Sequence, residues 1–312
     1  MKQYLKSVAR MLPYIRRLID ERDALRAERD ALAAGYGEFP GGHYYSPIPA
    51  PDEIRRRAGR LFDRSRKDVP SIDLNVEGQL ETLRRIEEFY GDCPFPDGPS
   101  GDFRYYFDNQ FFSYSDAIFT YGMIRLASPS RIVEVGSGYP SCVMLDTNER
   151  SFGGRIRLIF IEPDPARLRS RLRLDDVNAV EIHERMVQDV DLAVFEALGP
   201  GDILFIDSSH VTKVGSDVNH MVFEVLPRLS PGVYVHFHDM FYPFEYPEDW
   251  ILGQRRYWNE DYLLRAFLQF NGSYAIAVWD HFLWLRFGDR IAASMPRCAR
   301  NPGGSLWLVR SG

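Results

Sequence analysis

Two predicted strands each end in a pair of side chains that can exchange protons or bind ions. Asp207 and His210 follow the fourth predicted strand, and His238 and Asp239 end the fifth. Ligands of open α/β sheets bind beyond the carboxyl ends of the strands, and these two strands are expected to be neighbours. Because histidine changes charge near neutral pH, His210 could accept a proton there. We therefore predict a functional site that contains these four side chains.

The segment 131–141, RIVEVGSGYPS, combines a short apolar run with two glycines. Residues 132–135 are typical of a parallel strand that is buried on both faces. Gly136 and Gly138 permit a tight turn and allow a ligand to approach the backbone. A helix is expected to follow, because Pro140 is tolerated near a helix start. Strand, glycine turn and helix together predict the nucleotide-binding crevice of a doubly wound sheet.

Two acidic residues lie close to this glycine turn. Glu134 precedes the first glycine by two positions, and Glu162 closes the second predicted strand. A carboxylate at the second position can accept hydrogen bonds from both hydroxyls of a ribose. The patterns E-x-G-x-G and E-x-D resemble those of class I S-adenosylmethionine-dependent methyltransferases, from about residue 128 to the C-terminus. The resemblance implies S-adenosylmethionine as cofactor, and its binding residues would be Glu134, Gly136, Ser137, Gly138, Glu162, Asp164, Gln188 and Asp207.

We call the side chains of Asp207, His210, His238 and Asp239 the strand-end group. This group is similar to the one in metal-dependent O-methyltransferases. By this resemblance Asp207 would be the first metal ligand, His238 and Asp239 would complete the metal site, and His210 would be the catalytic base beside Asp207. His238 departs from the family pattern, because magnesium prefers oxygen ligands. Manganese, zinc or iron accept a mixed imidazole and carboxylate shell more readily, so the metal could be any of these four ions.

The rest of the chain supplies elements that alternate in the order expected of a parallel sheet. After the glycine turn we predict strands at 158–161, 179–182, 202–206 and 233–239, helices at 165–172 and 216–229, and two last strands at 273–278 and 305–309. In the methyltransferase family the final strand is antiparallel. The predicted fold class is therefore α/β, a doubly wound Rossmann-like seven-stranded sheet with a final antiparallel strand, preceded by an N-terminal helical extension.

Three parts of the chain are expected: an N-terminal helix at 1–34, a linker with a helical and aromatic lid region at 35–127, and the methyltransferase domain at 128–312. In the first part Leu18, Leu25 and Leu32 lie seven residues apart. The alternate seam positions are Ile15, Arg22 and Arg29, so only half of a coiled-coil stripe is present. A helix that forms a homodimer and a solvated helix docked by one edge both remain open.

The lid region contains an aromatic segment, 103–114, directly before the domain. Most of its rings are expected to pack in the core. In class I methyltransferases this segment often covers the cofactor. By resemblance, Tyr106, Asn109 and Tyr114 are therefore further candidates for the site.

Composition narrows the classes of partner. A formal charge of −6 and a pI near 5.7 argue against nucleic-acid binding. Three widely spaced cysteines fit a reducing compartment. No apolar run is long enough to span a membrane, and arginines interrupt the N-terminus where a secretory signal would lie. We therefore expect a cytoplasmic protein, and the methyltransferase resemblance implies a small molecule or a sugar as the acceptor.

Three alternatives remain open at this stage. His236 or His238 with Asp207 could form a two-histidine, one-carboxylate iron site, as in hydroxylase-like proteins that resemble methyltransferases. Glu162 would serve a nicotinamide-dependent dehydrogenase equally well. The chain could also be a non-catalytic scaffold, whose function a substitution of Asp207 would not disturb.

Overall fold

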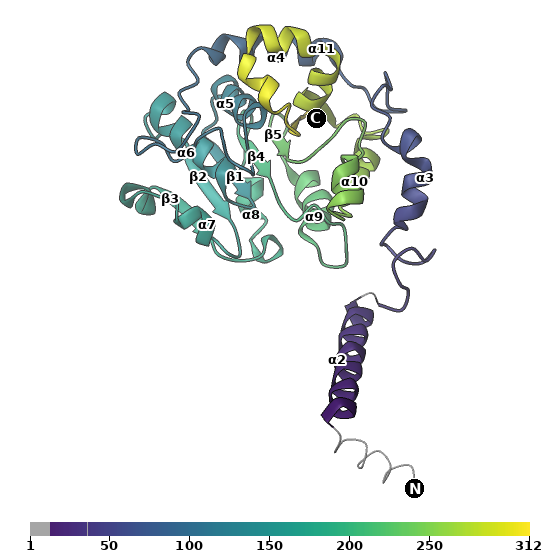
Figure 1. Cartoon of the computed structure of the whole chain (residues 1–312). Coiled ribbons are helices and arrows are strands. Elements are labelled where there is room, and N and C mark those ends of the chain that lie inside the picture. The colour runs from purple at the N-terminus through teal and green to yellow at the C-terminus, as the bar shows by residue number, and fades with distance from the viewer. Residues whose placement is uncertain (1–12, 36) are drawn as a thin grey trace. The chain divides into compact units, whose positions relative to one another are not determined.

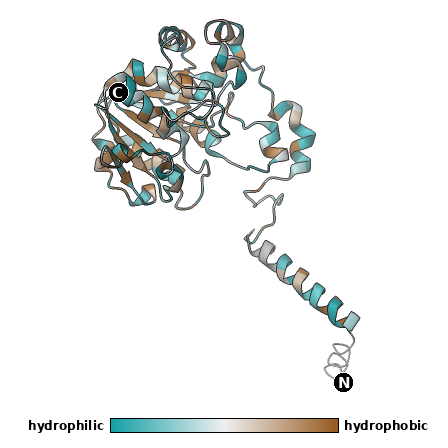
Figure 2. Ribbon diagram, turned by 60° about the vertical axis from the view of Figure 1, so that its left-hand side comes forward, coloured by the Kyte–Doolittle hydropathy of each residue, from teal (hydrophilic) through white to brown (hydrophobic). Residues whose placement is uncertain are grey.

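Seven short apolar runs form one mixed sheet in the computed structural model, which describes residues 13–35 and 37–312 (Figure 1). Figure 2 shows these strands in the brown of hydrophobic residues, and every residue of β4 is buried. This burial accounts for the nearly continuous apolar runs in the sequence. The strands are β1 (Arg131–Val135), β2 (Arg157–Ile161), β3 (Val180–His183), β4 (Ile203–Ile206), β5 (Tyr234–Phe237), β6 (Tyr274–Trp279) and β7 (Leu306–Arg310).

The strand order is β3-β2-β1-β4-β5-β7-β6. Strands β1 to β5 pair in parallel, whereas β7 is antiparallel to both of its neighbours. The order reverses between β1 and β4, which makes their carboxyl ends the switch point where ligands of such sheets bind. The predicted fold class and the antiparallel last strand are confirmed.

The parallel strands end level with one another. Val135 of β1 is paired with Ile161 of β2 and with Ile206 of β4, and Ile206 is paired with Phe237 of β5. The residues that follow these four strands therefore meet at one edge of the sheet. This register brings the sequence motifs together.

Helix α5 packs against both α4 and α6, and α4 also packs on β6. The helix predicted at 216–229 is irregular: α9 is followed by a π-helical turn at Met221–Val225 and a 3-10 turn at Leu226–Arg228, which contains Pro227. A proline inside a helix removes a backbone donor, so the regular helix ends before it. The α-helices are α2 (Pro13–Gly35), α3 (Pro51–Leu61), α4 (Val76–Tyr90), α5 (Ser115–Ala127), α6 (Tyr139–Phe152), α7 (Ala166–Arg169), α8 (Ala193–Glu196), α9 (Asp217–His220), α10 (Glu260–Leu268) and α11 (Asp280–Ser294).

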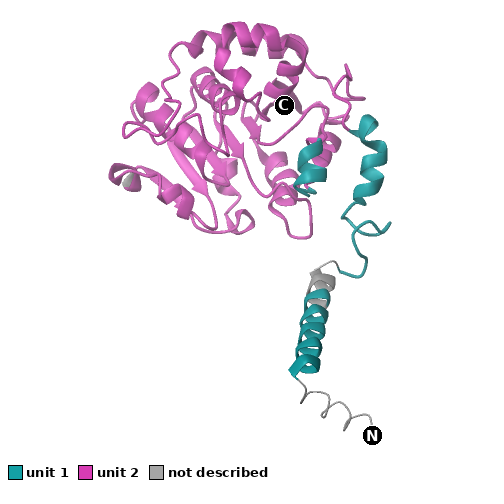
Figure 3. Cartoon of the chain, in the orientation of Figure 1, with its two compact units in different colours: residues 1–61, 248–257 teal, residues 62–247, 258–312 magenta. Residues whose placement is uncertain are grey.

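The chain forms two compact units (Figure 3). The first comprises residues 1–61 and 248–257, and the second comprises residues 62–247 and 258–312. The sheet and all the predicted site residues belong to the second unit.

Helix α2 is a polar helix whose seam leucines contact solvent. Leu18 is 47% exposed and Leu25 is 59% exposed, while the side chain of Leu32 lies outside the described residues. Homodimerisation through this helix stays a prediction. Among the described residues, no helix is both long and apolar enough to cross a membrane.

The imidazole of His281 gives a prediction about stability. Its Nδ1 accepts a hydrogen bond from the backbone N–H of Tyr242 at 2.9 Å, and burial, with a smaller contribution from Arg64, lowers its pKa to about 3. The unfolded chain, with a histidine pKa near 6.5, therefore binds more protons than the folded one between these two values. We expect the free energy of unfolding to fall as the pH drops from about 6.5 towards 3, by up to a few kcal/mol from this group.

Urea denaturation at pH 7 and pH 4.5 measures this contribution. His281→Asn keeps an acceptor for Tyr242 but does not titrate in this range, so its stability should depend less on pH than that of the unchanged protein. Equal pH slopes for the two proteins would show that His281 is not held as a neutral imidazole.

Candidate active site at the carboxyl edge of the sheet

Backbone hydrogen bonds continue the sheet register one residue beyond the strands. The N–H of Gly136 donates to Ile161 at 3.0 Å, and that of Asp207 donates to Val135 at 2.9 Å. The N–H of His238 donates to Ile206 at 3.0 Å. The glycine turn and the ends of β4 and β5 are therefore fixed side by side before any side chain is considered.

Gly136 has no room for a side chain. Its φ is +83°, and a Cβ placed on it would lie 1.7 Å from the carbonyl oxygen of Asp207. Gly138 differs, because its backbone is extended with φ of 179° and an added Cβ would lie 3.4 Å from the Cδ of Arg167. Approach of a ligand to the backbone of Gly136 stays a prediction, and the structure shows that the carbonyl of Asp207 comes close to it. The glycine turn and the exit of β4 are thus in contact.

Two carboxyl groups, those of Glu134 and Glu162, form hydrogen bonds with residues of the turn and of the helix that follows it. Glu162 accepts hydrogen bonds from the backbone N–H of Ser137 at 3.0 Å and of Asp164 at 2.9 Å, so β2 is tied to the turn. Glu134 is fully buried; its Oε2 accepts from the hydroxyl of Ser141, and its Oε1 has no partner among the described residues. Burial raises the pKa of Glu134 well above its usual value, and Asp207 and Glu162 add to this effect.

Two other predicted cofactor residues, Asp164 and Gln188, form hydrogen bonds with backbone groups outside the turn. Asp164 is exposed, and its Oδ1 accepts from the N–H of Ala166 at 3.4 Å. Gln188 lies in the 3-10 turn after β3, and its amide donates to the carbonyl of Gly215 at 2.6 Å. Its contact with a cofactor stays a prediction.

The four predicted strand-end side chains meet. His210 Nε2 lies 3.6 Å from Asp207 Oδ1 and 3.7 Å from Asp239 Oδ2, and His238 Nε2 lies 3.4 Å from Asp239 Oδ1. The imidazole side chains are only 6% exposed, while those of Asp207 and Asp239 are 25% and 16% exposed. The group therefore reaches solvent through its carboxylates.

The charges within this group depend on one another. Burial disfavours the imidazolium of His210, but Asp207, Glu260 and Asp239 outweigh it and raise the pKa of His210 well above its usual value. Burial also disfavours the imidazolium of His238, but Asp239 and Asp207 outweigh this effect and raise the pKa of His238. The pKa of Asp207 is lowered, because the two imidazoles outweigh its own burial. At neutral pH an ionised Asp207 therefore faces imidazolium.

A metal centre is not formed by these side chains as they stand. Within residues 13–35 and 37–312, no three or more His, Cys, Asp or Glu side chains are arranged closely enough to hold an ion. The types of donor nevertheless fit a divalent ion with mixed nitrogen and oxygen ligands. Between two of the predicted ligands, His238 Nε2 and Asp239 Oδ1, the separation of 3.4 Å is close to the roughly 3.4 Å between two ligands that bind one tetrahedral ion at about 2.1 Å.

Two buried carboxylates behind the imidazoles were missed by the sequence analysis. Glu260, at the start of α10, has its Oε2 2.9 Å from His210 Nδ1 and is 1% exposed. Asp116, in the first turn of α5, has its Oδ1 3.9 Å from His238 Nδ1. Acidic residues are common in first helical turns because they stabilise the helix dipole. Nothing in the sequence distinguishes these two acids from ordinary ones at such positions.

One of the three aromatic-segment candidates, Tyr106, contacts the helix that follows the glycine turn. The hydroxyl of Tyr106 lies 2.9 Å from that of Tyr139, the first residue of α6. Asn109 instead holds its own loop together with hydrogen bonds to Tyr106 and Phe112. The ring of Tyr114 stacks on Phe107 in the core.

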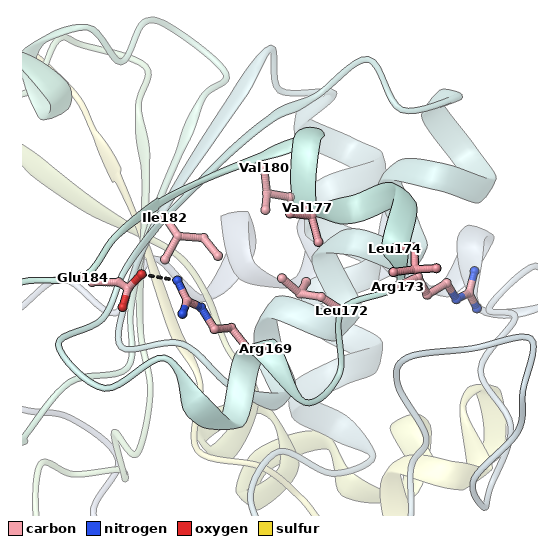
Figure 4. Close-up of a pocket in the computed structure, with 8 residues that line it drawn as sticks. All are labelled: Arg169, Leu172, Arg173, Leu174, Val177, Val180, Ile182 and Glu184. Atoms are coloured by element: carbon pink, nitrogen blue, oxygen red, sulfur yellow. Dashed lines mark hydrogen bonds and ion pairs between the residues drawn. The ribbon is translucent and has the colours of Figure 1, made fainter.

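A separate hollow of 590 Å³ lies against the edge strand β3 (Figure 4). Arg169 of α7 points across it towards Glu184, with which it forms an ion pair. None of the predicted cofactor residues lines this hollow. Its lining is formed by Arg169, Leu172, Arg173, Leu174, Val177, Val180, Ile182 and Glu184.

Comparison with known proteins gives three kinds of similarity. Residues 133–240 match the family described as "Methyltransferase domain", a range that includes the glycine turn and the strand-end group. An uncharacterized protein of Archaeoglobus fulgidus is 39% identical over 163 residues, which are 51% of this chain and 73% of that protein.

Two solved structures are similar to this chain at low sequence identity. The O-methyltransferase TomG from Streptomyces achromogenes, involved in tomaymycin synthesis and solved with S-adenosylmethionine, is 15% identical with a TM-score of 0.41, over 84% of this chain and 96% of that one. The Podospora anserina methyltransferase PaMTH1, solved with S-adenosylhomocysteine, is 15% identical with a TM-score of 0.41, over 85% and 98% of the two chains.

Proposed function

Because the chain belongs to the class I S-adenosylmethionine-dependent methyltransferases, we propose that it methylates a hydroxyl oxygen of a small molecule or a sugar. The supporting observation is the contact between the glycine turn and the exit of β4, where Gly136 adjoins the carbonyl of Asp207. This contact would place the methyl donor beside the imidazoles and carboxylates of the strand ends. A dehydrogenase does not fit this assignment, since its sheet would lack the antiparallel β7.

The charges around the turn suit this donor. S-adenosylmethionine carries a positive sulfonium and a positive ammonium group, and three carboxylates, those of Glu134, Glu162 and Asp207, lie around the turn. The unpartnered Oε1 of Glu134 could accept a hydrogen bond from the ammonium, because buried polar atoms normally have a partner. Each oxygen of Glu162 accepts one backbone hydrogen bond and has a second lone pair for a ribose hydroxyl.

In the proposed reaction His210 accepts the proton of the acceptor hydroxyl at Nε2. The hydroxyl oxygen attacks the methyl carbon as the carbon–sulfur bond breaks, and the electron pair of that bond stays on sulfur. Positioning two reactants in a shielded cleft can itself supply several kcal/mol. The reaction needs a neutral His210, whereas its carboxylate neighbours favour the imidazolium.

We further propose that Asp207, His238 and Asp239 hold a divalent ion. When bound, such an ion would orient the acceptor hydroxyl, lower its pKa and neutralise the two carboxylates that favour a protonated His210. Equilibrium dialysis of the purified protein against zinc, manganese, ferrous iron and magnesium tests this directly. Loss of ion binding in Asp239→Asn supports the assignment, and undiminished binding contradicts it.

Substitution of Glu162 tests the donor site. Glu162→Gln removes the charge but keeps the shape, and we expect the dissociation constant for S-adenosylmethionine to rise about 10- to 100-fold, because a hydrogen bond to a charged group contributes about 1.5–3 kcal/mol. Calorimetric titration measures it. Glu181→Gln on β3 is the matched control, since Glu181 pairs with Arg157 and His183 away from the turn. Unchanged affinity in Glu162→Gln, or equal binding of NAD, would contradict the donor assignment.

One observation favours a second candidate. Two imidazoles and two carboxylates at one strand edge also suit non-heme iron, which would support hydroxylation on the same fold. The two functions differ in their products. Transfer of a labelled methyl group from S-adenosylmethionine to an acceptor supports the methyltransferase, whereas acceptor-dependent oxygen uptake by the iron-loaded protein without methyl transfer supports the hydroxylase.

A further inference from the structure

The two imidazoles of the strand-end group have the same arrangement. Each directs Nε2 towards Asp239, and each directs Nδ1 towards a buried carboxylate from a distant helix. The pair of His210 and Glu260 is the closer one, with Nδ1 and Oε2 2.9 Å apart, while His238 and Asp116 are separated by 3.9 Å. Only the first pair is at hydrogen-bond distance.

The backbone around His210 is fastened to the start of α10. The carbonyl of His210 accepts hydrogen bonds from the N–H groups of Asn259 and Glu260 at 3.1 and 3.2 Å. The side chain of Asn259 accepts from the N–H of Thr212 at 2.5 Å and donates to its carbonyl at 3.2 Å. The ring of Trp258 lies over the imidazole, with centroids 4.5 Å apart. Residues 258–260 therefore fix both the backbone and the ring of His210.

The burial of Glu260 needs a partner, and His210 is that partner. Glu260 is 1% exposed, and its Oε1 has no hydrogen-bond partner among the described residues. A buried carboxylate is costly unless a group of opposite charge or a donor compensates it. The ring nitrogen Nδ1 of His210 lies at hydrogen-bond distance from Glu260 Oε2.

We propose that Glu260 is a positioning residue that accepts the Nδ1 proton of His210 and so leaves Nε2 as the nitrogen that works in the site. The proposal rests on the proposed function, in which the acceptor proton passes to Nε2. Glu260 accepts this hydrogen bond and takes no proton in this scheme. Its contribution is to fix the tautomer and the direction of the ring, as the buried acid does in hydrolase triads.

The first test observes the Nδ1 proton directly. In protein labelled with ¹⁵N-histidine, we expect a downfield, slowly exchanging proton coupled to His210 Nδ1, and His210→Gln assigns the signal. The signal should disappear in Glu260→Leu and remain in Asp261→Asn. Asp261 is the matched control, because it is the next residue of α10 and is fully buried. Burial raises the pKa of Asp261 well above its usual value, so asparagine mimics its neutral form. Absence of the signal in the unchanged protein overturns the proposal, whether or not Glu260→Leu folds.

The second test separates positioning from folding. We expect kcat for methyl transfer to fall about 100-fold or more in Glu260→Leu, and less in Glu260→Gln, which retains an acceptor oxygen. The affinity for S-adenosylmethionine should stay within twofold in both variants, since Glu260 does not contact the glycine turn. Full turnover in Glu260→Leu overturns the proposal. If the unchanged protein transfers no methyl group, the proposed function fails, while the Nδ1 signal still decides whether Glu260 orients His210.

Discussion

His210→Ala is expected to lower methyl transfer about 100- to 10,000-fold, the usual contribution of a positioned general base, and to leave binding of S-adenosylmethionine intact. The expectation follows from where its nitrogens point. Nδ1 is held by Glu260, and Nε2 faces Asp207 and Asp239 at 3.6 and 3.7 Å. His238 has a similar arrangement, but its Nδ1 lies 3.9 Å from Asp116, beyond hydrogen-bond distance.

Single-turnover kinetics with labelled S-adenosylmethionine, together with calorimetric titration, separates the two effects. His183→Asn is the matched control, because His183 ends β3 and pairs with Glu181 instead of the strand-end group. Its turnover should stay within about twofold. Full turnover in His210→Ala would show that His210 is not the base, and the carboxylates of Asp207 and Asp239 would then be the remaining candidates for it.

The sequence could predict the meeting of the four strand-end residues because parallel strands have a simple geometry. Asp207 and His210 follow β4, His238 and Asp239 follow β5, and the in-register pairing of Ile206 with Phe237 brings the ends of the two strands together. The same reasoning placed Glu162 next to the glycine turn. Each prediction depended only on local apolar runs and on the rule that ligands bind at the carboxyl edge.

The sequence could not predict the residues behind the imidazoles. Glu260 is 50 residues from His210 in the chain, and Asp116 lies in a helix that precedes the whole sheet. Both occupy first helical turns, where an acid is expected for a local reason. Their burial against imidazoles is a result of tertiary packing, and no spacing in the sequence carries that information.

The role of Gly136 also depended on tertiary structure. Its type was correctly connected with a tight turn, because φ of +83° favours glycine. The structure adds a steric reason of its own, since the backbone carbonyl of Asp207, directly after β4, comes close. This contact matters because it makes the glycine a requirement of the fold as well as of the site.

Gly136→Ala is therefore expected to lower the free energy of unfolding by more than about 4 kcal/mol, which is exceptional for one methyl group. The added Cβ would lie 1.7 Å from the carbonyl of Asp207, and a left-handed φ adds a cost of about 1–2 kcal/mol for a residue other than glycine. Relief requires β1 and β4 to separate at the point where the proposed donor and base sites adjoin. Binding of S-adenosylmethionine should then be lost together with stability.

Gly138→Ala is the matched control, two residues further along the same turn. Its extended φ of 179° suits any residue, and its added Cβ would meet only the flexible side chain of Arg167 at 3.4 Å. We expect urea denaturation to show a change below about 1 kcal/mol for this variant. If the two alanine variants are equally stable, the close approach of Gly136 and Asp207 is wrong. The donor site and the strand-end group would then not share an edge, and the proposed methyl transfer would lose its structural basis.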